Sequence, residues 1–295
     1  MLSRSNRSSF KRREAWAGFL FAVPAMSLFL LFAVFPIVRT IYLSFFDYNM
    51  LVAPKFIGLE NYRSLLTDPL FWQSFRATVF YLVATYVPTV ILALALAVAL
   101  NRDFRFRGFF RGLYFTPVVM SMVVVSVIWK LLFNYRGLIN QLLSHVGAGP
   151  ITWLTSSTYA PWALAIMSIW KTFGYYMVIY LAGLQGIPIE VREAAHIDGA
   201  TSWQTFMHIT LPLLRPITVF VITMSVLTGM QEFTAQYVMT GGGPSGATRV
   251  LALMIYETGF SFMRMGKASA ISVLLFVVLL SVTFGQRRWL GINDY

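Results

Sequence analysis

The sequence predicts an all-α fold, a polytopic membrane helical bundle with six transmembrane helices. Of its 295 residues 58% are hydrophobic and only 12% are charged, and the mean hydropathy is +0.69. A soluble domain carries about 25% charged residues. The apolar runs are also long and continuous rather than alternating, which favours membrane helices over the strands of a barrel. The chain has no cysteine, which excludes a disulfide framework and a thiolate metal site.

Six apolar segments are the predicted spans. The first covers about 15–46 and is longer than a bilayer requires, so we expect it to tilt or to project from the membrane. The other five cover about 74–100, 109–133, 160–184, 209–234 and 266–286. A short surface helix is expected near 59–66 in the segment between the first two spans. Prolines at 24, 36 and 88 are expected to bend the helices that contain them, and Pro117 lies near the start of the third span.

The basic residues predict the orientation of these spans. Thirteen Lys and Arg fall on the side of the two termini and eight on the other side, and the first group lies in the shorter loops. Basic loops usually face the cytoplasm. The sequence therefore predicts a cytoplasmic basic tail at 1–14, a transmembrane domain at 15–286 and a cytoplasmic tail at 287–295. Orientation thus explains the net charge of +12, and nucleic acid is not expected as a partner.

Two other motifs have simple interpretations. Residues 101–111 mix Arg with Phe, a composition that also occurs in nucleic-acid sites, but between two spans it indicates a cytoplasmic interfacial loop. Residues 241–246 are rich in glycine, yet they lack the Gly-Lys-Ser/Thr ending of a phosphate-binding loop and follow no strand. We expect them to form a flexible outer loop.

A polar island separates the fourth and fifth spans. It runs from Glu190 to Trp203 and continues to Pro216. Pro188 suits the first turn of a helix, acidic residues follow where the helix dipole favours them, and Gly199 suits its end. The residues predict a short capped helix with small side chains. By this reasoning alone, a simple connector and a docking element remain equally good interpretations.

The island resembles the EAA loop of permeases in binding-protein-dependent ABC importers. The motif is Glu193-Ala-Ala-x-x-Asp-Gly-Ala200, followed by Phe206, Ile209, Leu211-Pro212 and Pro216. The segments 56–62 (FIGLENY), 181–188 (LAGLQGIP) and 240–244 (TGGGP) resemble the branch that includes the maltose and glycerol-phosphate permeases. The resemblance covers most of the chain and implies the fold of a type I ABC importer permease.

The resemblance also implies a mechanism and a set of partners. The EAA coupling loop, at about 187–212, would sit in a cleft of a separate cytoplasmic ATPase and convert its closure into alternating access of the spans. The residues implied in ATPase coupling are Glu193, Ala194, Ala195, Asp198, Gly199 and Ala200. The implied partners are a second homologous permease, two ATPase subunits, an extracytoplasmic solute-binding protein and membrane lipid. ATP and Mg would bind to the ATPase and no cofactor to this chain, which would be no enzyme, and the implied location is a bacterial or archaeal cytoplasmic (inner) membrane.

The substrate would be a sugar or a sugar-like solute. Polar residues within spans are candidates for a substrate path. Alignment with the maltose permease implies substrate binding by Ser168, Lys171, Thr172, Tyr175, Ser225, Thr228, Gly229 and Glu232. Five of these positions, 171, 172, 228, 229 and 232, depart from the maltose permease. Lys171 would equally suit an anionic substrate of the glycerol-phosphate type, and a structural ion pair is the alternative explanation for Lys171 and Glu232.

Two functions of other classes remain as alternatives. A stand-alone secondary transporter commonly shows repeated halves and intramembrane acidic residues for ion coupling, and neither is evident here. A membrane-embedded enzyme needs a catalytic constellation, and the sequence offers no Ser/His/Asp set and no paired carboxylates.

Overall fold

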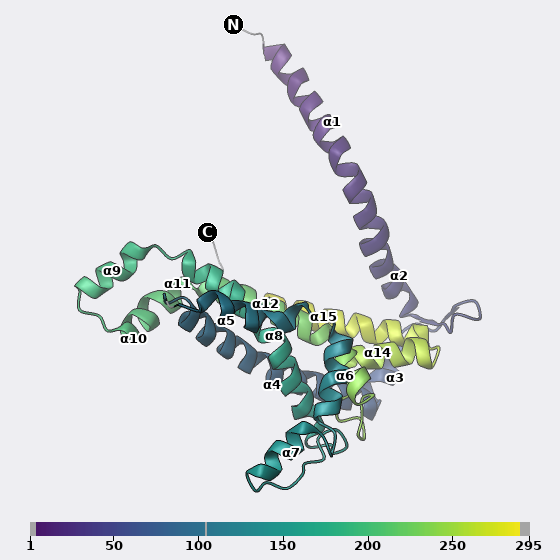
Figure 1. The fold of residues 1–295 in the computed structure, drawn as a ribbon. Coiled ribbons are helices and arrows are strands. Elements are labelled where there is room, and N and C mark those ends of the chain that lie inside the picture. The colour runs from purple at the N-terminus through teal and green to yellow at the C-terminus, as the bar shows by residue number, and fades with distance from the viewer. Residues whose placement is uncertain (1–3, 104, 290–295) are drawn as a thin grey trace. The chain divides into compact units, whose positions relative to one another are not determined.

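The protein is described from a computed structural model, in which residues 4–103 and 105–289 are described (Figure 1). The chain divides into two compact units. The first comprises Met1–Ser64 with Thr258–Val273, and the second comprises Leu65–Glu257 with Leu274–Tyr295.

The first unit contains the N-terminal apolar helix and a small hairpin. The helix consists of α1 (Arg4–Phe29), a π-helical turn η1 (Leu30–Val34) and α2 (Phe35–Leu43). Strand β1 (Phe46–Asp47) then pairs antiparallel with β2 (Lys55–Phe56). The helix starts at Arg4, well before the predicted start of the first span at 15, so most of the predicted basic tail is helical.

Buried hydrogen bonds fix the hairpin to the following helix α3 (Glu60–Leu66). The Asn61 side-chain amide donates to the carbonyl oxygens of Ser44, at 2.9 Å, and Phe46, at 3.0 Å. The first residues of α15 (Met265–Trp289) lie against the same hairpin, where the Gly266 backbone N–H donates to the Tyr48 carbonyl. A Cβ atom on Gly266 would lie 1.9 Å from the Phe46 carbonyl oxygen, so only glycine permits this approach.

The second unit is a helical bundle in which α4 and α8 form the most extensive contact. Its helices are α4 (Pro69–Leu100), α5 (Arg107–Val119), α6 (Met122–Leu132), α7 (Leu138–His145), α8 (Ala160–Gln185), α9 (Ile189–Ile197), α10 (Ser202–Thr205), η2 (Phe206–Thr210), α11 (Leu211–Leu213), α12 (Arg215–Gln231), α13 (Thr234–Met239) and α14 (Leu251–Tyr256). The π-helical turn η3 (Glu257–Ser261) precedes α15. The predicted surface helix near 59–66 is confirmed as α3.

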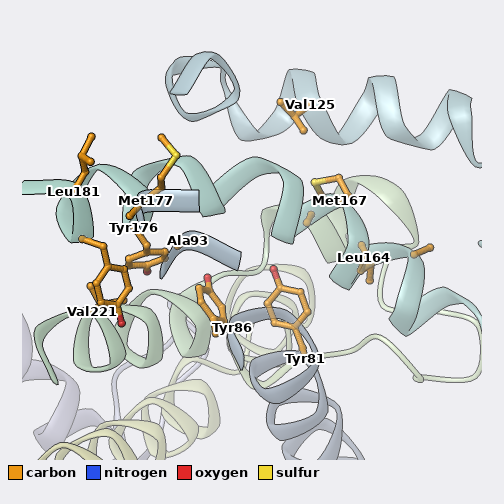
Figure 2. Close-up of a cluster of buried hydrophobic side chains, with 14 of the residues drawn as sticks. Tyr81, Tyr86, Ala93, Val125, Leu164, Met167, Tyr176, Met177, Leu181 and Val221 are labelled. Atoms are coloured by element: carbon orange, nitrogen blue, oxygen red, sulfur yellow. The ribbon is translucent and has the colours of Figure 1, made fainter. Parts of the chain in front are cut away.

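The core of this unit lies between α4, α8 and α12 (Figure 2). Figure 2 shows Tyr81 and Tyr86 side by side on α4, with Tyr176 on the neighbouring α8. All three are almost fully buried. Small residues permit close packing: a Cβ atom on Gly174 of α8 would lie 2.0 Å from the Tyr114 carbonyl oxygen of α5.

The described residues contain four helices long and apolar enough to span a membrane, and two bent helix pairs raise the number to six. The predicted third span at 109–133 is a bent pair of helices, which together pass the test for one span. Its helix breaks between α5 and α6 and bends by 98°, because Met120 and Ser121 are extended. The predicted fifth span at 209–234 is also bent. The chain turns by 65° before α12, and the helix ends at Gln231.

Candidate functional site

The polar island forms a short helix with a defined start and end. Helix α9 begins after Pro188, whose missing N–H costs nothing at a helix start. At its other end the Ala200 backbone N–H donates to the Ala195 carbonyl at 2.9 Å, and Gly199 adopts a left-handed φ of +77°. This pattern satisfies the last free carbonyl groups and requires glycine or a residue tolerant of that φ. The predicted helix and its glycine stop are confirmed.

Five of the six residues implied in ATPase coupling are accessible. Glu193, Ala194, Asp198 and Gly199 are exposed and Ala200 is half-buried, whereas Ala195 is 5% exposed and packs within its own chain. Two exposed carboxylates and the Gly199 turn thus belong to α9 and its end. Helix α9 lies on a loop that projects from the bundle (Figure 1).

The loop returns to the bundle through a second capped helix. The Thr201 hydroxyl accepts a hydrogen bond from the Gln204 backbone N–H, and the Gln204 side chain accepts one from the Thr201 backbone N–H at 2.8 Å. This reciprocal capping box fixes the start of α10. Helix α10 continues through η2 and α11 to the bend before α12, so a continuous, nearly all-helical segment connects the polar loop to an intramembrane helix.

A cavity of about 520 Å³ lies between this loop and the end of α4. Arg102 and Asp103, which follow α4, line one side of it, while Glu193 and His196 of α9 line the other. Glu193 therefore borders a space inside its own chain as well as solvent. Among the described residues no group of three or more His, Asp or Glu is placed to hold a metal ion.

The predicted substrate residues on α8 make internal hydrogen bonds. The Ser168 hydroxyl, which is 1% exposed, bonds the Tyr81 hydroxyl at 2.8 Å. The Lys171 ammonium donates to the carbonyl oxygen of Val118 at 2.8 Å, next to the break between α5 and α6. The Thr172 hydroxyl donates to the Ser168 carbonyl at 2.7 Å.

The predicted substrate residues on and near α12 also make mostly internal contacts. Ser225 donates to the Ile222 carbonyl at 2.8 Å, and the Glu232 carboxylate accepts from the Thr234 backbone N–H at 2.7 Å, at the start of α13. Gly229 lies against Tyr86, whose ring a Cβ atom would meet at 2.3 Å. Tyr175 and Thr228 are the two members of the predicted set with exposed side chains.

Sequence reasoning missed the polar stripe of α4. It consists of Ser74, Thr78, Tyr81, Thr85 and Thr89, all buried. Thr78 accepts from the Leu251 backbone N–H at 2.8 Å, and Tyr81 bonds Ser168 of α8. The sequence carries a signal for this stripe: polar residues recur at spacings of three and four within an apolar run, which places them on one face of a helix. It joins α4 to α14 and to α8.

Comparison with known proteins identifies the family of the chain. Residues 89–290 match the family described as binding-protein-dependent transport system inner membrane component. The chain is 36% identical over 278 residues to the trehalose/maltose transport system permease protein MalF of Thermococcus litoralis, covering 94% of each chain. It is 35% identical over 291 residues to the lactose transport system permease protein LacF of Rhizobium radiobacter, covering 97% of each.

The fold has a close counterpart among solved structures. A chain of a bacterial ABC transporter involved in the import of the acidic polysaccharide alginate superposes with a TM-score of 0.84 at 21% identity, covering 98% of this chain and 100% of that one. The predicted fold class is thereby confirmed. The family match excludes a stand-alone secondary transporter. The chain belongs to the family of binding-protein-dependent transport system inner membrane components and is a multi-pass permease of an ABC importer, not an enzyme.

Proposed function

We propose that this chain carries a sugar or sugar-like solute across the cytoplasmic membrane of a bacterium or archaeon. Relatives that match more than nine-tenths of the chain are named for transport of trehalose and maltose, lactose, and arabinooligosaccharides, the last at 32% identity in Bacillus subtilis. A second, homologous permease would complete the path, two ATPase subunits would bind ATP and Mg, and a soluble protein would deliver the solute. A related solved structure contains a bacterial alginate ABC transporter with its pentasaccharide-bound periplasmic protein.

The exposed helix α9 is the observation that carries this proposal. It places the Glu193 and Asp198 carboxylates and the Gly199 turn on a projecting loop, where a basic cleft of an ATPase can receive them. Gly199 has no heavy atom within 4 Å of the position of a Cβ, so another backbone can approach it closely. Movement of α9 would pass through α10, η2 and α11 to α12.

The substrate path is proposed to follow the exposed side chains of α8 and α12. Tyr175 offers a ring for stacking on a sugar, and Thr228 offers a hydroxyl for hydrogen bonding. Lys171, in contrast, is buried and uses one of its three N–H donors on a backbone carbonyl. Its burial and internal bond favour a neutral sugar, and a substrate of the glycerol-phosphate type is the alternative that the substrate test decides.

The coupling role is tested with the reconstituted transporter and variants of α9. We expect Glu193→Ala and Gly199→Val to reduce substrate-stimulated ATP hydrolysis and transport by roughly 5–150-fold, the usual range of coupling between sites. Glu190→Ala is the matched control, because Glu190 is an exposed carboxylate in the first turn of the same helix. Its activity should remain near that of the wild type. Transport by the chain without the ATPase, or full coupling in both variants, would show the proposal to be wrong.

The substrate class is tested separately. Uptake of a labelled disaccharide and of glycerol 3-phosphate is compared in vesicles that contain the complete transporter and its binding protein. We expect the disaccharide to be transported and Tyr175→Ala to raise its KM by about 5–200-fold, as loss of an apolar contact of about 1–3 kcal/mol in a substrate site implies. Uptake of glycerol 3-phosphate alone would establish the anionic alternative.

A further inference from the structure

A groove of about 590 Å³ runs along the surface of α4 toward the polar loop. One wall consists of Ile91, Ala95 and Val98 on successive turns of α4. The opposite wall consists of Trp203 and Phe206, whose rings lie 5.9 Å apart. Trp203 is 65% exposed although it is the largest side chain of the loop. The groove therefore offers apolar surface that the chain itself does not cover.

The length and position of the groove match one leaflet of a bilayer. From Ile91 to the end of α4 at Leu100 there are nine steps along the helix, or about 14 Å at 1.5 Å per residue. Half of a hydrocarbon core of about 30 Å is about 15 Å. Arg102 is the first charged residue after the apolar run of α4, and it closes the groove at one end. Trp203 lies beside it, as an aromatic residue does at a membrane interface.

The charge at the closed end is positive. Asp103 forms an ion pair with Arg107. Arg102 and Arg105 are exposed and have no carboxylate within ion-pair distance among the described residues. The Ser202 hydroxyl lines the same end of the groove. A guanidinium and a hydroxyl at the mouth of an apolar groove form a complementary site for a phosphate that carries an acyl chain.

We propose that this groove binds an anionic phospholipid of the cytoplasmic leaflet, with an acyl chain along α4 and the phosphate at Arg102. The choice of the cytoplasmic leaflet rests on the proposed function, in which the coupling loop faces a cytoplasmic ATPase. The lipid contacts α4 through Ala95 and Val98 and the coupling loop through Trp203, so it holds α10 against the bundle. Anionic lipid therefore increases the coupling between the ATPase and the spans.

Binding is tested on the full chain in detergent by native mass spectrometry, with phosphatidylglycerol and phosphatidylcholine as probes. We expect Arg102→Gln to weaken phosphatidylglycerol binding about fivefold, the equivalent of one basic residue near an anionic surface. Ala95→Trp, which fills the groove, should reduce it at least as much. The matched controls are Arg76→Gln, an exposed Arg at the other end of α4, and Val87→Trp, an exposed α4 residue outside the groove, and both should bind as the wild type does.

The outcomes separate the possible occupants. Equal binding by wild type, Arg102→Gln and Ala95→Trp overturns the proposal. Displacement of phosphatidylglycerol by excess inorganic phosphate overturns it as well, because the site then recognises phosphate alone. Ala95→Cys can carry a thiol-specific photocrosslinker at this one position, because this chain has no native cysteine. Crosslinking of that label to the second permease in the assembled transporter shows a protein in the groove and also overturns the proposal. Lipid binding needs no transport, so its failure leaves the Glu193 test of the proposed function intact.

Discussion

The Lys171 ammonium of α8 lies 2.8 Å from the carbonyl oxygen of Val118, at the break between α5 and α6. A broken helix inside a membrane leaves carbonyl groups without their usual donors, and each is costly unless the protein satisfies it. The C-terminal end of α5 also carries a partial negative charge, which favours a cation. Lys171 thus donates a hydrogen bond to a carbonyl group at the break, and that carbonyl is a partner for its own buried charge.

We expect Lys171→Met to destabilise the protein by about 1–3 kcal/mol, the cost of leaving the half-buried Val118 carbonyl unsatisfied. Thermal unfolding of the purified chain in detergent measures this loss. If Lys171 acts on the break alone, the maximal rate of the reconstituted transporter should fall while the KM changes little.

The matched control is Lys130→Met. Lys130 also donates to a backbone carbonyl, that of Val238, at 3.0 Å, but its side chain is exposed. Water can replace this bond, so the variant should unfold close to the wild-type temperature. A Lys171→Met protein with normal stability and a raised KM would instead identify Lys171 as a substrate contact.

The bond between Tyr81 and Ser168 predicts coupled mutational effects. Each single variant, Tyr81→Phe or Ser168→Ala, removes the same 2.8 Å bond and should cost about 1 kcal/mol. The double variant should cost less than the sum of the two, because the second change has no bond left to remove. Denaturant unfolding of the four proteins gives the interaction energy. Additive losses, with a raised KM in Ser168→Ala alone, would place the Ser168 hydroxyl on the substrate.

Gly229 predicts a steric effect in the core. A Cβ atom there would lie 2.3 Å from the Tyr86 ring, so Gly229→Ala should overpack the contact between α12 and α4 and cost about 1–3 kcal/mol. Gly112→Ala is the control, because Gly112 lies within α5 and has no heavy atom within 4 Å of a Cβ. It should be neutral or stabilise by up to about 1 kcal/mol. Equal melting temperatures for the two variants would contradict the close approach of Gly229 to Tyr86.

Much of the architecture was predictable from composition and local signals. The long apolar runs predicted α4, α8 and α15 to within a few residues at most boundaries, because burial in lipid requires about 20 apolar residues whatever their neighbours are. Pro188 and Gly199 predicted α9, because both act through the backbone of a single residue.

The breaks and the polar contacts were not predictable in the same way. Next to the break, the Val118 carbonyl accepts from a distant donor, Lys171, which lies more than 50 residues later in the chain. The implied role of Ser168 and Lys171 in substrate binding came from aligned positions, which do not show that each side chain already has an internal partner. Whether these residues also reach the substrate stays a prediction.

Asn140 predicts the largest effect outside the membrane-spanning helices. Its buried side-chain amide donates to the carbonyl oxygens of Tyr135, at 3.0 Å, and Ile151, at 2.9 Å, and accepts from the Ile151 backbone N–H, at 3.1 Å, and from Trp153 Nε1, at 3.0 Å. Asn140→Leu has a similar volume and leaves these groups unpaired, so it should cost about 2–4 kcal/mol and expose residues 134–159 to proteolysis. Asn140→Asp keeps the acceptor and loses the two donated bonds, so its loss of stability should lie between zero and that of Asn140→Leu. Gln141→Leu, at the exposed neighbouring position, should be near neutral, and an Asn140→Leu chain as protease-resistant as that control would refute the role of Asn140.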